Sequence, residues 1–254
     1  MKGKWIAVLA VAMLSFAASA FAQSSGNFSY STTGNGENPI ACTMDSGGKI
    51  SGGFTCQSSC TIDVNGVSTC VPQSGQCIGN AVAGIKTSSG NGNVFVVRPS
   101  AVIGLLTDVT VSSNQKGSST GAVSSSALAG VNFQVSVTGP GKPKVIPDFP
   151  ITYESRYIQI STNLFQALST QCLMITGGCF ISFNESTVSA HSFDWIVTNL
   201  QSGTYTVTTS WKDSLGGSGI SQSLACVGPL NVTVQQNKVF SFNTPGGVTP
   251  INTP

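Results

Sequence analysis

From about residue 94 onward, apolar and polar residues alternate with a period of two, and this alternation restricts the fold more than any other feature of the chain. Residues 131–138 are the clearest example, because their apolar side chains all fall on one face: Val131, Phe133, Val135 and Val137. Successive side chains of a β-strand point to opposite faces, so the pattern predicts a strand with one buried face. The sequence Gly-Pro-Gly at 139–141 predicts the turn that ends this strand.

Three later segments repeat the alternation, with the apolar sets Phe193, Trp195 and Val197, then Tyr205, Val207 and Trp211, then Leu230, Val232 and Val234. Gln236 and Asn237 are predicted to form a turn, and 162–169 is the best place for a helical turn. Weaker strand candidates cover 94–98, 102–111, 151–161 and 179–184. Short strands at this spacing, without a helical period, predict an all-β protein built as an antiparallel β-sandwich.

The chain begins with the features of a secretory signal peptide. A basic start, Met-Lys-Gly-Lys, precedes an apolar run over 5–17 and the small-residue sequence Ala20-Phe21-Ala22. We expect cleavage after Ala22, with 18–20 as the second choice, because signal peptidase requires small residues at its site. The apolar run is shorter than the roughly 20 residues that a membrane-spanning helix needs. The sequence therefore predicts a secreted, periplasmic or cell-surface protein that does not insert into a membrane after cleavage.

Charged residues make up only 8% of the chain, against about 25% in typical soluble proteins. Of the eleven basic residues, Lys2 and Lys4 leave with the signal peptide, and the nine that remain balance nine acidic ones. Nucleic acid is therefore an unsuitable partner, because its binding requires a basic surface. A neutral surface rich in Ser, Thr and Gly tolerates close contact with copies of itself, with cell-surface components or with a neutral polysaccharide.

Eight cysteines in an exported chain predict disulfide bonds, and all eight are candidates: Cys42, Cys56, Cys60, Cys70, Cys77, Cys172, Cys179 and Cys226. Five lie before residue 80 and three after residue 170, so complete pairing within one chain requires at least one bond between the two regions. Spacing does not select among the roughly one hundred possible pairings. At 172–179, a hairpin turn at Gly177-Gly178 and a local Cys172–Cys179 bond are alternatives. No C-x-x-C pair occurs, so we predict neither a metal site nor a cofactor.

Composition divides the chain into six segments: a signal peptide at 1–22, a flexible leader at 23–40, a Cys-rich segment at 41–80, a linker at 81–93, the β-sandwich domain at 94–244 and a loose tail at 245–254. The Cys-rich segment has few large apolar residues, so we expect its disulfides to order it. The leader and linker are predicted from their polar, Gly-rich composition.

Residues 193–207 carry Phe193-x-Trp195 followed by Leu200-x-x-Gly203-x-Tyr205-x-Val207. This string resembles the strand and L-x-x-G-x-Y-x-V signature of immunoglobulin-like domains, including fibronectin type III, transthyretin-like and CnaB-type modules. It is also similar to segments of exported bacterial proteins that have no assigned activity. The resemblance implies an immunoglobulin-like sandwich in which Tyr205 forms a structural corner with Leu200 and Gly203, its ring in the core and its hydroxyl bonded to nearby backbone.

CnaB-type modules often contain an isopeptide bond between Lys and Asn that an acidic residue assists. By this resemblance, Lys142 or Lys144, together with Asn243 and Glu154, could supply the parts, although no motif fixes these positions.

Two sets of residues invite a catalytic interpretation. The segment 117–121 matches the G-x-S-x-G elbow of serine hydrolases around Ser119, and Asp148 and His191 follow in the hydrolase order. That elbow joins a buried strand to a long helix, whereas the flanks here are Ser-rich, so we interpret the match as chance and His191 as a strand-edge histidine with local hydrogen bonds. We interpret most of the acidic candidates for a glycosidase pair as solvated loop charges: Glu154, Glu185, Asp148 and Asp194.

These features together predict a non-enzymatic, extracellular β-sandwich protein of surface structure, adhesion or matrix. Carbohydrate binding is an alternative, in which Trp211, Tyr153 and Tyr157 are the aromatic side chains that could stack on a sugar ring. A secreted serine hydrolase is the third hypothesis, and it depends on the set Ser119, Asp148 and His191.

Overall fold

The computed structural model describes residues 27–32, 41–63, 66–73, 78–87, 93–112, 124–161, 163 and 180–238. Apart from the single helical residue Asn163, every element in these ranges is a β-strand and every strand pair is antiparallel, which confirms the predicted all-β class. The predictions for the signal peptide, the tail and most of 162–169 lie outside the described residues, as do Cys77, Ser119, Cys172, Cys179 and Asn243.

The strands follow one another along the chain as β1 (Phe28–Thr32), β2 (Cys42–Met44), β3 (Ile50–Gly52), β4 (Phe54–Ile62), β5 (Ser68–Gln73), β6 (Ile78–Thr87), β7 (Asn93–Ser112), β8 (Ser125–Thr138), β9 (Lys144–Ile146), β10 (Ile151–Ile160), β11 (Phe180–Ser192), β12 (Trp195–Thr198), β13 (Gly203–Ser218) and β14 (Ile220–Lys238).

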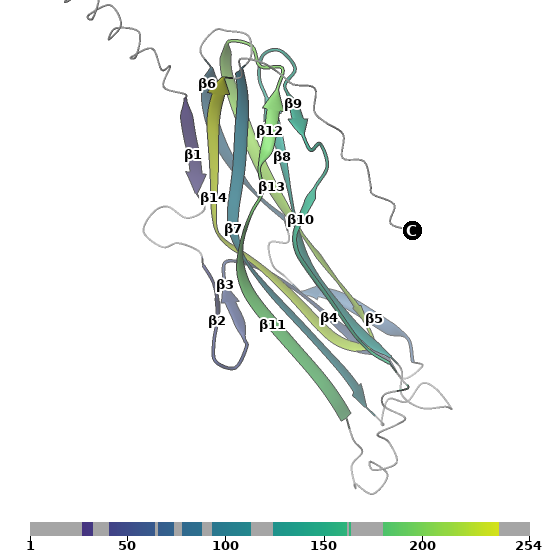
Figure 1. Ribbon diagram of the computed structural model, residues 1–254. Helices are drawn as coiled ribbons and strands as arrows, with labels where there is room; N and C mark the ends of the chain where they lie inside the picture. Colours follow the sequence, from purple (N-terminus) through teal and green to yellow (C-terminus); the bar gives the residue numbers. More distant parts are fainter. Residues whose placement is uncertain are drawn as a thin grey trace, which may run out of the picture.

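Two sheets form the body of the molecule (Figure 1). The larger sheet has the order β5-β4-β14-β7-β12-β9, with β1 also paired to β14 and β11 also paired to β7. The smaller sheet has the order β10-β8-β13-β6, and β2 and β3 form a separate hairpin. The main hydrophobic core takes residues from both sheets, so the sheets face each other as the two layers of a sandwich.

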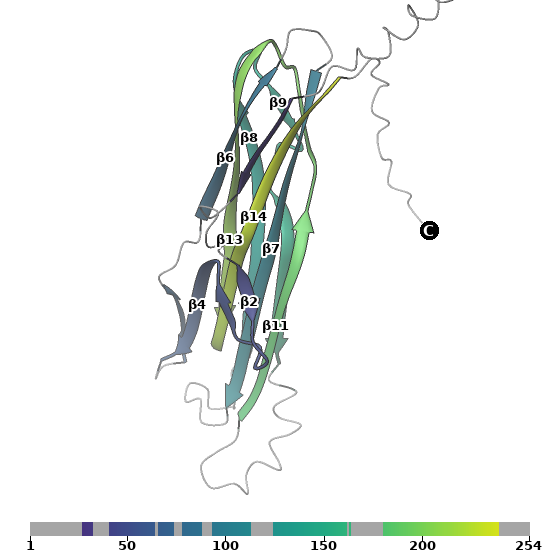
Figure 2. The ribbon, with the colours of Figure 1, turned by 90° about the vertical axis from the view of Figure 1, so that its left-hand side faces the viewer.

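The longest strands run along an elongated molecule and change partners on the way (Figures 1 and 2). β7 and β14 pair with each other along most of their length, and a register shift leaves two residues of β14, Gly228 and Pro229, opposite Val102 as a bulge. Residues 230–238 of β14 and the strands beside them, including β1, β6, β9 and β12, form what we call the upper half. Residues 220–227 and the strands beside them, including β4, β5, β10 and β11, form the lower half.

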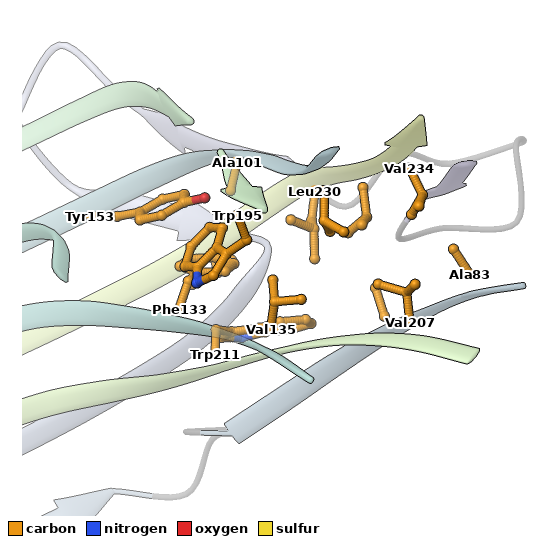
Figure 3. Packing of buried hydrophobic residues seen from close by; sticks show 14 of the residues in the cluster. Ala83, Ala101, Phe133, Val135, Tyr153, Trp195, Val207, Trp211, Leu230 and Val234 are labelled. Carbon is orange, nitrogen blue, oxygen red and sulfur yellow. The ribbon is translucent and has the colours of Figure 1, made fainter. Parts of the chain in front are cut away.

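The alternation in the sequence selects the buried faces of the upper half. The residues predicted to face the core are buried, including Phe133, Val135, Trp195, Tyr205, Val207, Trp211, Leu230, Val232 and Val234. Figure 3 shows several of these side chains meeting between the two layers. Burying one large apolar side chain contributes about 1.5–3 kcal/mol, so this cluster is a main source of stability for the upper half.

Two predicted details of the C-terminal strands differ from the structure. Gln236 and Asn237 form no turn, because β14 stays paired with β7 up to Lys238. Phe193 precedes β12 instead of belonging to it, and its partly exposed ring packs edge-on against Trp195. Alternation placed Phe193 in its strand, and Gln236 and Asn237 were predicted as a turn after the strand at 230–234, but neither local signal marks where pairing starts or stops.

The segments before residue 94 belong to the same sandwich. Part of the predicted linker forms β6, whose inward side chains Ala81, Ala83 and Ile85 join the main core. Part of the predicted flexible leader forms β1, and β4 from the Cys-rich segment pairs with β14. These strands therefore complete both sheets instead of preceding them.

Two disulfide bonds lie within the described residues. Cys42 of β2 bonds to Cys226 of β14 across 184 residues of sequence, and Cys60 of β4 bonds to Cys70 of β5. Cys56 is also disulfide-bonded. The Cys42–Cys226 bond joins the early and late cysteine regions, as the count of cysteines on each side required. A closure of this length stabilises a fold by about 2–4 kcal/mol.

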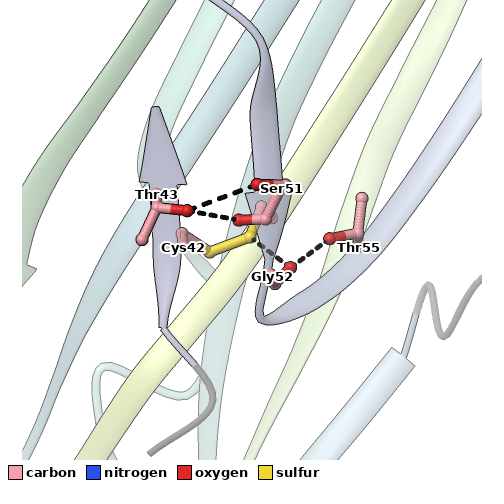
Figure 4. The surroundings of a disulfide bond; sticks show 6 residues. Cys42, Thr43, Ser51, Gly52 and Thr55 are labelled. Carbon is pink, nitrogen blue, oxygen red and sulfur yellow. Dashed lines mark hydrogen bonds between the residues drawn. A yellow bond between two sulfur atoms is a disulfide. The ribbon is translucent and has the colours of Figure 1, made fainter. Parts of the chain in front are cut away.

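The Cys42–Cys226 bond packs against the tight turn between β3 and β4 (Figure 4). Thr43 and Ser51 face each other across the β2–β3 hairpin with their hydroxyl oxygens 3.3 Å apart, and Thr55 donates a hydrogen bond to the carbonyl of Gly52. Gly53 has a φ of 59°, and a Cβ there would lie 2.6 Å from the sulfur atoms of both bonded cysteines. Glycine is therefore required at this position by conformation and by space.

Candidate functional site

A polar cluster between β10 and β11 is the most connected group of titratable side chains in the part of the chain that the structure describes. Glu154 comes from β10, and Thr187, Ser189 and His191 come from alternate positions of β11, so all three share one face of that strand. Thr187 donates to Oε1 of Glu154 at 2.9 Å, and Ser189 donates to Oε2 at 2.6 Å. Nε2 of His191 lies 3.1 Å from the same Oε2 and 2.7 Å from the Ser189 hydroxyl.

The topology explains why these residues meet. β10 is the edge strand of the smaller sheet, and β11 pairs with β7 in the larger sheet, so the cluster spans the open side of the sandwich. Arg156, two residues after Glu154, extends it by donating from Nη2 to the Thr187 hydroxyl at 2.8 Å. Its Nε also lies 3.7 Å from Glu185 of β11. β10 and β11 belong to different sheets and share no main-chain hydrogen bonds, so the side chains of this cluster connect the two layers here.

Burial and hydrogen bonding act in opposite directions on Glu154. Burial raises the pKa of its carboxyl group, but the hydrogen bonds from Ser189, Thr187 and His191 and the positive charge available to His191 outweigh burial, so the pKa is lowered overall. Glu154 is therefore a carboxylate at neutral pH. A carboxylate that accepts several hydrogen bonds is a strong acceptor at the centre of the network.

The hydrogen-bond directions determine what this cluster can do chemically. The single hydroxyl proton of Ser189 is donated to Glu154, so the hydroxyl oxygen is left to accept from His191. Nε2 of His191 must then carry a proton, because both of its neighbours act as acceptors toward it. A serine nucleophile needs an unprotonated histidine nitrogen facing its hydroxyl. The arrangement joins β10 to β11 but does not activate Ser189.

The remaining candidates from the sequence have separate surroundings. Asp194 accepts two hydrogen bonds of 2.6 Å from Arg98, and these hydrogen bonds lower its pKa. Asp194 nevertheless lies exposed in the connection between β11 and β12, as expected for a loop charge. Glu154 lies on β10 and is largely buried, so it is not the solvated loop charge that we expected. Asp148 lies between β9 and β10, outside the cluster around His191.

Two of the three predicted sugar-stacking aromatics lie in the core. The Trp211 ring packs between Phe54 and Phe133, with centroids 5.3 Å and 6.1 Å away. The Tyr153 ring stacks on Phe133 at 4.2 Å, and its hydroxyl donates to the carbonyl of Pro99. Both side chains are buried, so their faces are not open to a ligand, whereas Tyr157 is exposed. Trp211 occupies an inward position of the alternation on β13, whereas on β10 a β-bulge at Tyr153 shifts the alternation, so that Tyr153 faces the core and Tyr157 faces solvent.

Tyr205 has the arrangement that the resemblance implied. Its ring is fully buried, and its hydroxyl lies 2.8 Å from the carbonyl oxygens of Pro140 and Gln201, which share its single proton, while it accepts from the Gln201 amide at 2.7 Å. Leu200 is buried beside the same turn. Gly203 has a φ of 147°, and a Cβ there would lie 2.8 Å from the Pro140 ring. Tyr205 therefore fixes the β8–β9 turn to the turn that precedes β13.

Asp213 of β13 is a buried ionisable residue that the sequence analysis missed. It points inward on the face that also carries Tyr205, Val207 and Trp211, and neither carboxyl oxygen has a hydrogen-bond partner among the described residues. Burial raises the pKa of Asp213 to about 8. The period-two alternation already places position 213 on the core face, so that signal could have found it.

Among the described residues, no three His, Cys, Asp or Glu side chains are grouped as a metal site would need, and no helix is long and apolar enough to cross a membrane. No protein-family model matches the chain, and no curated protein matches it.

Proposed function

We propose that this chain is a non-enzymatic structural protein of the extracellular surface, acting in surface structure, adhesion or matrix. The observation that carries the proposal is the elongated two-layer body whose early strands are covalently joined to its last strand by Cys42–Cys226. Disulfide bonds indicate an oxidising environment, as outside the cytoplasm. The predicted signal peptide supports export of the same chain.

The side-chain chemistry supports this role. The Glu154, Ser189 and His191 group joins two edge strands through hydrogen bonds. Arg98 and Asp194 form a bidentate ion pair, so their two surface charges neutralise each other. An immunoglobulin-like type of sandwich is part of the proposal, and the corner made by Tyr205 supports it. A rigid and nearly neutral body of this kind suits close packing against neighbours.

Fractionation of the producing cells tests the proposal directly. We expect the native protein in the surface or extracellular matrix fraction, in material larger than a monomer when sized without reducing agent. A protein recovered only as a free monomer in the medium, with no affinity for cells or matrix, would contradict it. Comparison with a cytoplasmic marker protein controls for cell lysis.

Carbohydrate binding is a second candidate, and a pocket on the outer face of the smaller sheet favours it. The pocket has a volume of about 290 Å³, and its polar lining includes Asn132, Gln134, Ser210 and Lys212 beside the exposed Ile78. The Asn132 side chain is already held by Ser214 and Thr152. Amide, hydroxyl and ammonium groups over an apolar floor are suited to binding a neutral sugar.

Retention on immobilised polysaccharides tests this second candidate. We expect Gln134→Ala and Lys212→Ala to reduce retention, while Gln222→Ala, on the larger sheet, leaves it unchanged. Equal retention of all three variants, or no retention of the unaltered protein on any neutral polysaccharide, would exclude the pocket as a sugar site.

A further inference from the structure

The first strand, β1, is held mainly by its backbone. It pairs with β14 over five positions, from Phe28 opposite Gln235 to Thr32 opposite Asn231. None of its side chains is buried, and Phe28 and Tyr30 are largely exposed. Main-chain pairing is the same for any strand of suitable shape, so an element held this way is readily replaced by an equivalent one.

The edge that β1 covers needs a partner. Val232 and Val234 of β14 are fully buried directly behind it, and removing β1 would leave main-chain groups of residues 231–235 unpaired. An unpaired edge is a template for another strand unless charged residues or proline protect it. Residues 231–235 read Asn-Val-Thr-Val-Gln and contain neither.

The covalent structure leaves β1 free to move as a unit. The first cysteine of the chain is Cys42, and its bond to Cys226 fixes everything from β2 onward to β14. β1 precedes that bond, so it can withdraw without threading past any other strand. The eight residues 33–40 span at most about 28 Å when extended, so only an adjacent molecule lies within reach.

The β1 site is nevertheless specific. The Asn27 side chain donates to the Lys86 carbonyl of β6 and to Oε1 of Gln236 at 3.1 Å, and the Gln236 amide donates to the Asn27 carbonyl at 2.8 Å. These contacts fix the register of β1 against both sheets. Residues 27–32 and 231–237 carry no charge, so two copies can bring them together without repulsion.

We propose that β1 exchanges between molecules, so that β1 of one copy occupies the β14 edge of a second copy in the same register. The partner is a second copy of this chain, because Asn27 and residues 28–32 already match that edge in sequence, length and charge. Repetition of the exchange joins successive copies into a chain of sandwiches. The inference rests on the proposed structural role and gives it a mechanism of assembly.

Cysteine pairs placed on facing positions test the exchange. Tyr30→Cys and Thr233→Cys occupy opposite positions of β1 and β14, and we would produce them on two differently tagged chains in the same exporting cells. We expect a disulfide-linked dimer that carries both tags. The matched control replaces Thr233→Cys by Thr204→Cys, an exposed position on β13, and should give no such dimer. A single chain with Tyr30→Cys and Thr233→Cys controls for pairing within one molecule.

Proline variants give a second, independent readout. Ser31→Pro and Thr32→Pro are each combined with Tyr30→Cys. One of two successive strand amides faces the partner strand, so we expect one of these two variants to abolish the mixed dimer and the other to weaken it less. Ser24→Pro, before the strand, should leave it unchanged. Free thiol measurement on each variant shows whether the Cys42–Cys226 body has folded.

The outcomes separate the exchange from the proposed function. A mixed dimer at the level of the Thr204→Cys control, with efficient bonding within the doubly substituted chain, overturns the exchange. If the protein is still found in large surface material, the structural role stands and another contact joins the copies. If it is monomeric as well, the structural role fails with it.

Discussion

The upper and lower halves of the sandwich are built from the same long strands but filled in different ways. The upper half encloses large apolar side chains, with Phe95, Trp195 and Tyr205 fully buried. The lower half encloses aliphatic side chains, such as Leu105 and Val109, together with small and polar ones, including Ser58, Thr107, Ser125, Ser126, Asp213, Ser221 and Ser223. Both described disulfides lie in the lower half.

The upper and lower halves of the sandwich therefore gain their stability from different interactions. Hydrophobic burial increases with apolar area, so a core of aliphatic, alanine and serine residues contributes less than a core that also contains aromatic residues. Several buried hydroxyl and carboxyl oxygens of the lower half, from Thr107, Asp213 and Ser221, have no hydrogen-bond partner among the described residues and are a further cost. Disulfide bonds offset this weakness because they lower the entropy of the unfolded chain.

Trp195→Ala should have the largest effect, because it empties the centre of the upper core. We expect a loss of about 3–5 kcal/mol in the free energy of unfolding, measured by chemical denaturation. Ala127→Gly, at a small buried site of the lower half, is the matched comparison and should cost far less. Similar losses at the two sites would contradict the assignment of different cores.

Removing the Cys42–Cys226 bond should have the next largest effect. We expect the variant with both residues changed to alanine to lose about 2–4 kcal/mol. Removing Cys60–Cys70, which closes a loop of only ten residues of separation, should cost less. Thermal unfolding of both variants, with and without reductant, measures the ranking, and the reverse order would show that local strain dominates over chain length.

Asp213→Asn should stabilise the lower half at neutral pH, by about 1–3 kcal/mol. The pKa of Asp213 is raised from 3.8 to about 8, so the folded state holds a proton that the unfolded chain has released. The contribution of Asp213 to the free energy of unfolding is therefore largest below about pH 4 and falls as pH rises toward 8. Denaturation from pH 4 to 8 should show this fall in the unaltered protein and a smaller one in Asp213→Asn. If stability varies with pH in the same way in the unaltered protein and in Asp213→Asn, Asp213 is in contact with solvent.

Glu154→Gln should have the smallest effect, about 1 kcal/mol, because it weakens hydrogen bonds at a partly exposed site. Its pH dependence has the opposite sign. The pKa of Glu154 is lowered, so its contribution is present above the ordinary glutamate pKa of 4.5 and is lost as pH falls through the lower folded value. Hydrogen exchange of β10 and β11 amides in acid measures this, and Glu185→Gln, an exposed control, should change little.

The sequence predicted the faces of the strands better than their partners. Period-two alternation placed Phe133, Trp195 and Tyr205 in the core, and the Leu200 to Tyr205 string placed the corner. Composition concealed that β6 and β1 complete the sheets. At 81–93 the polar, Gly-rich end suggested a linker, although Ala81, Ala83 and Ile85 of β6 alternate and face the core. At 23–40 polar composition suggested a leader, and main-chain pairing needs no apolar residues, so a short polar strand such as β1 leaves little signal.

The candidate site was predicted in its parts but not as a group. His191 was expected to have local hydrogen bonds, and Ser189 does lie two residues away on the same strand. Glu154 is separated from His191 by 37 residues and belongs to the other sheet. Only the closure of the sandwich brings β10 beside β11, and no local pattern in either strand records that proximity.

By itself, the sequence determined the all-β class, the inward faces and the requirement for a disulfide between the early and late cysteine regions. The all-β class and the inward faces follow from the residue pattern within single strands. The disulfide between the two regions follows from the odd number of cysteines in each region, provided that all eight form bonds within one chain. The tertiary structure alone decided that Cys42 bonds to Cys226, that Asp213 is buried and that β1 covers the edge of β14. Those outcomes depend on which strands become neighbours, and the alternation that makes a strand does not encode its neighbour.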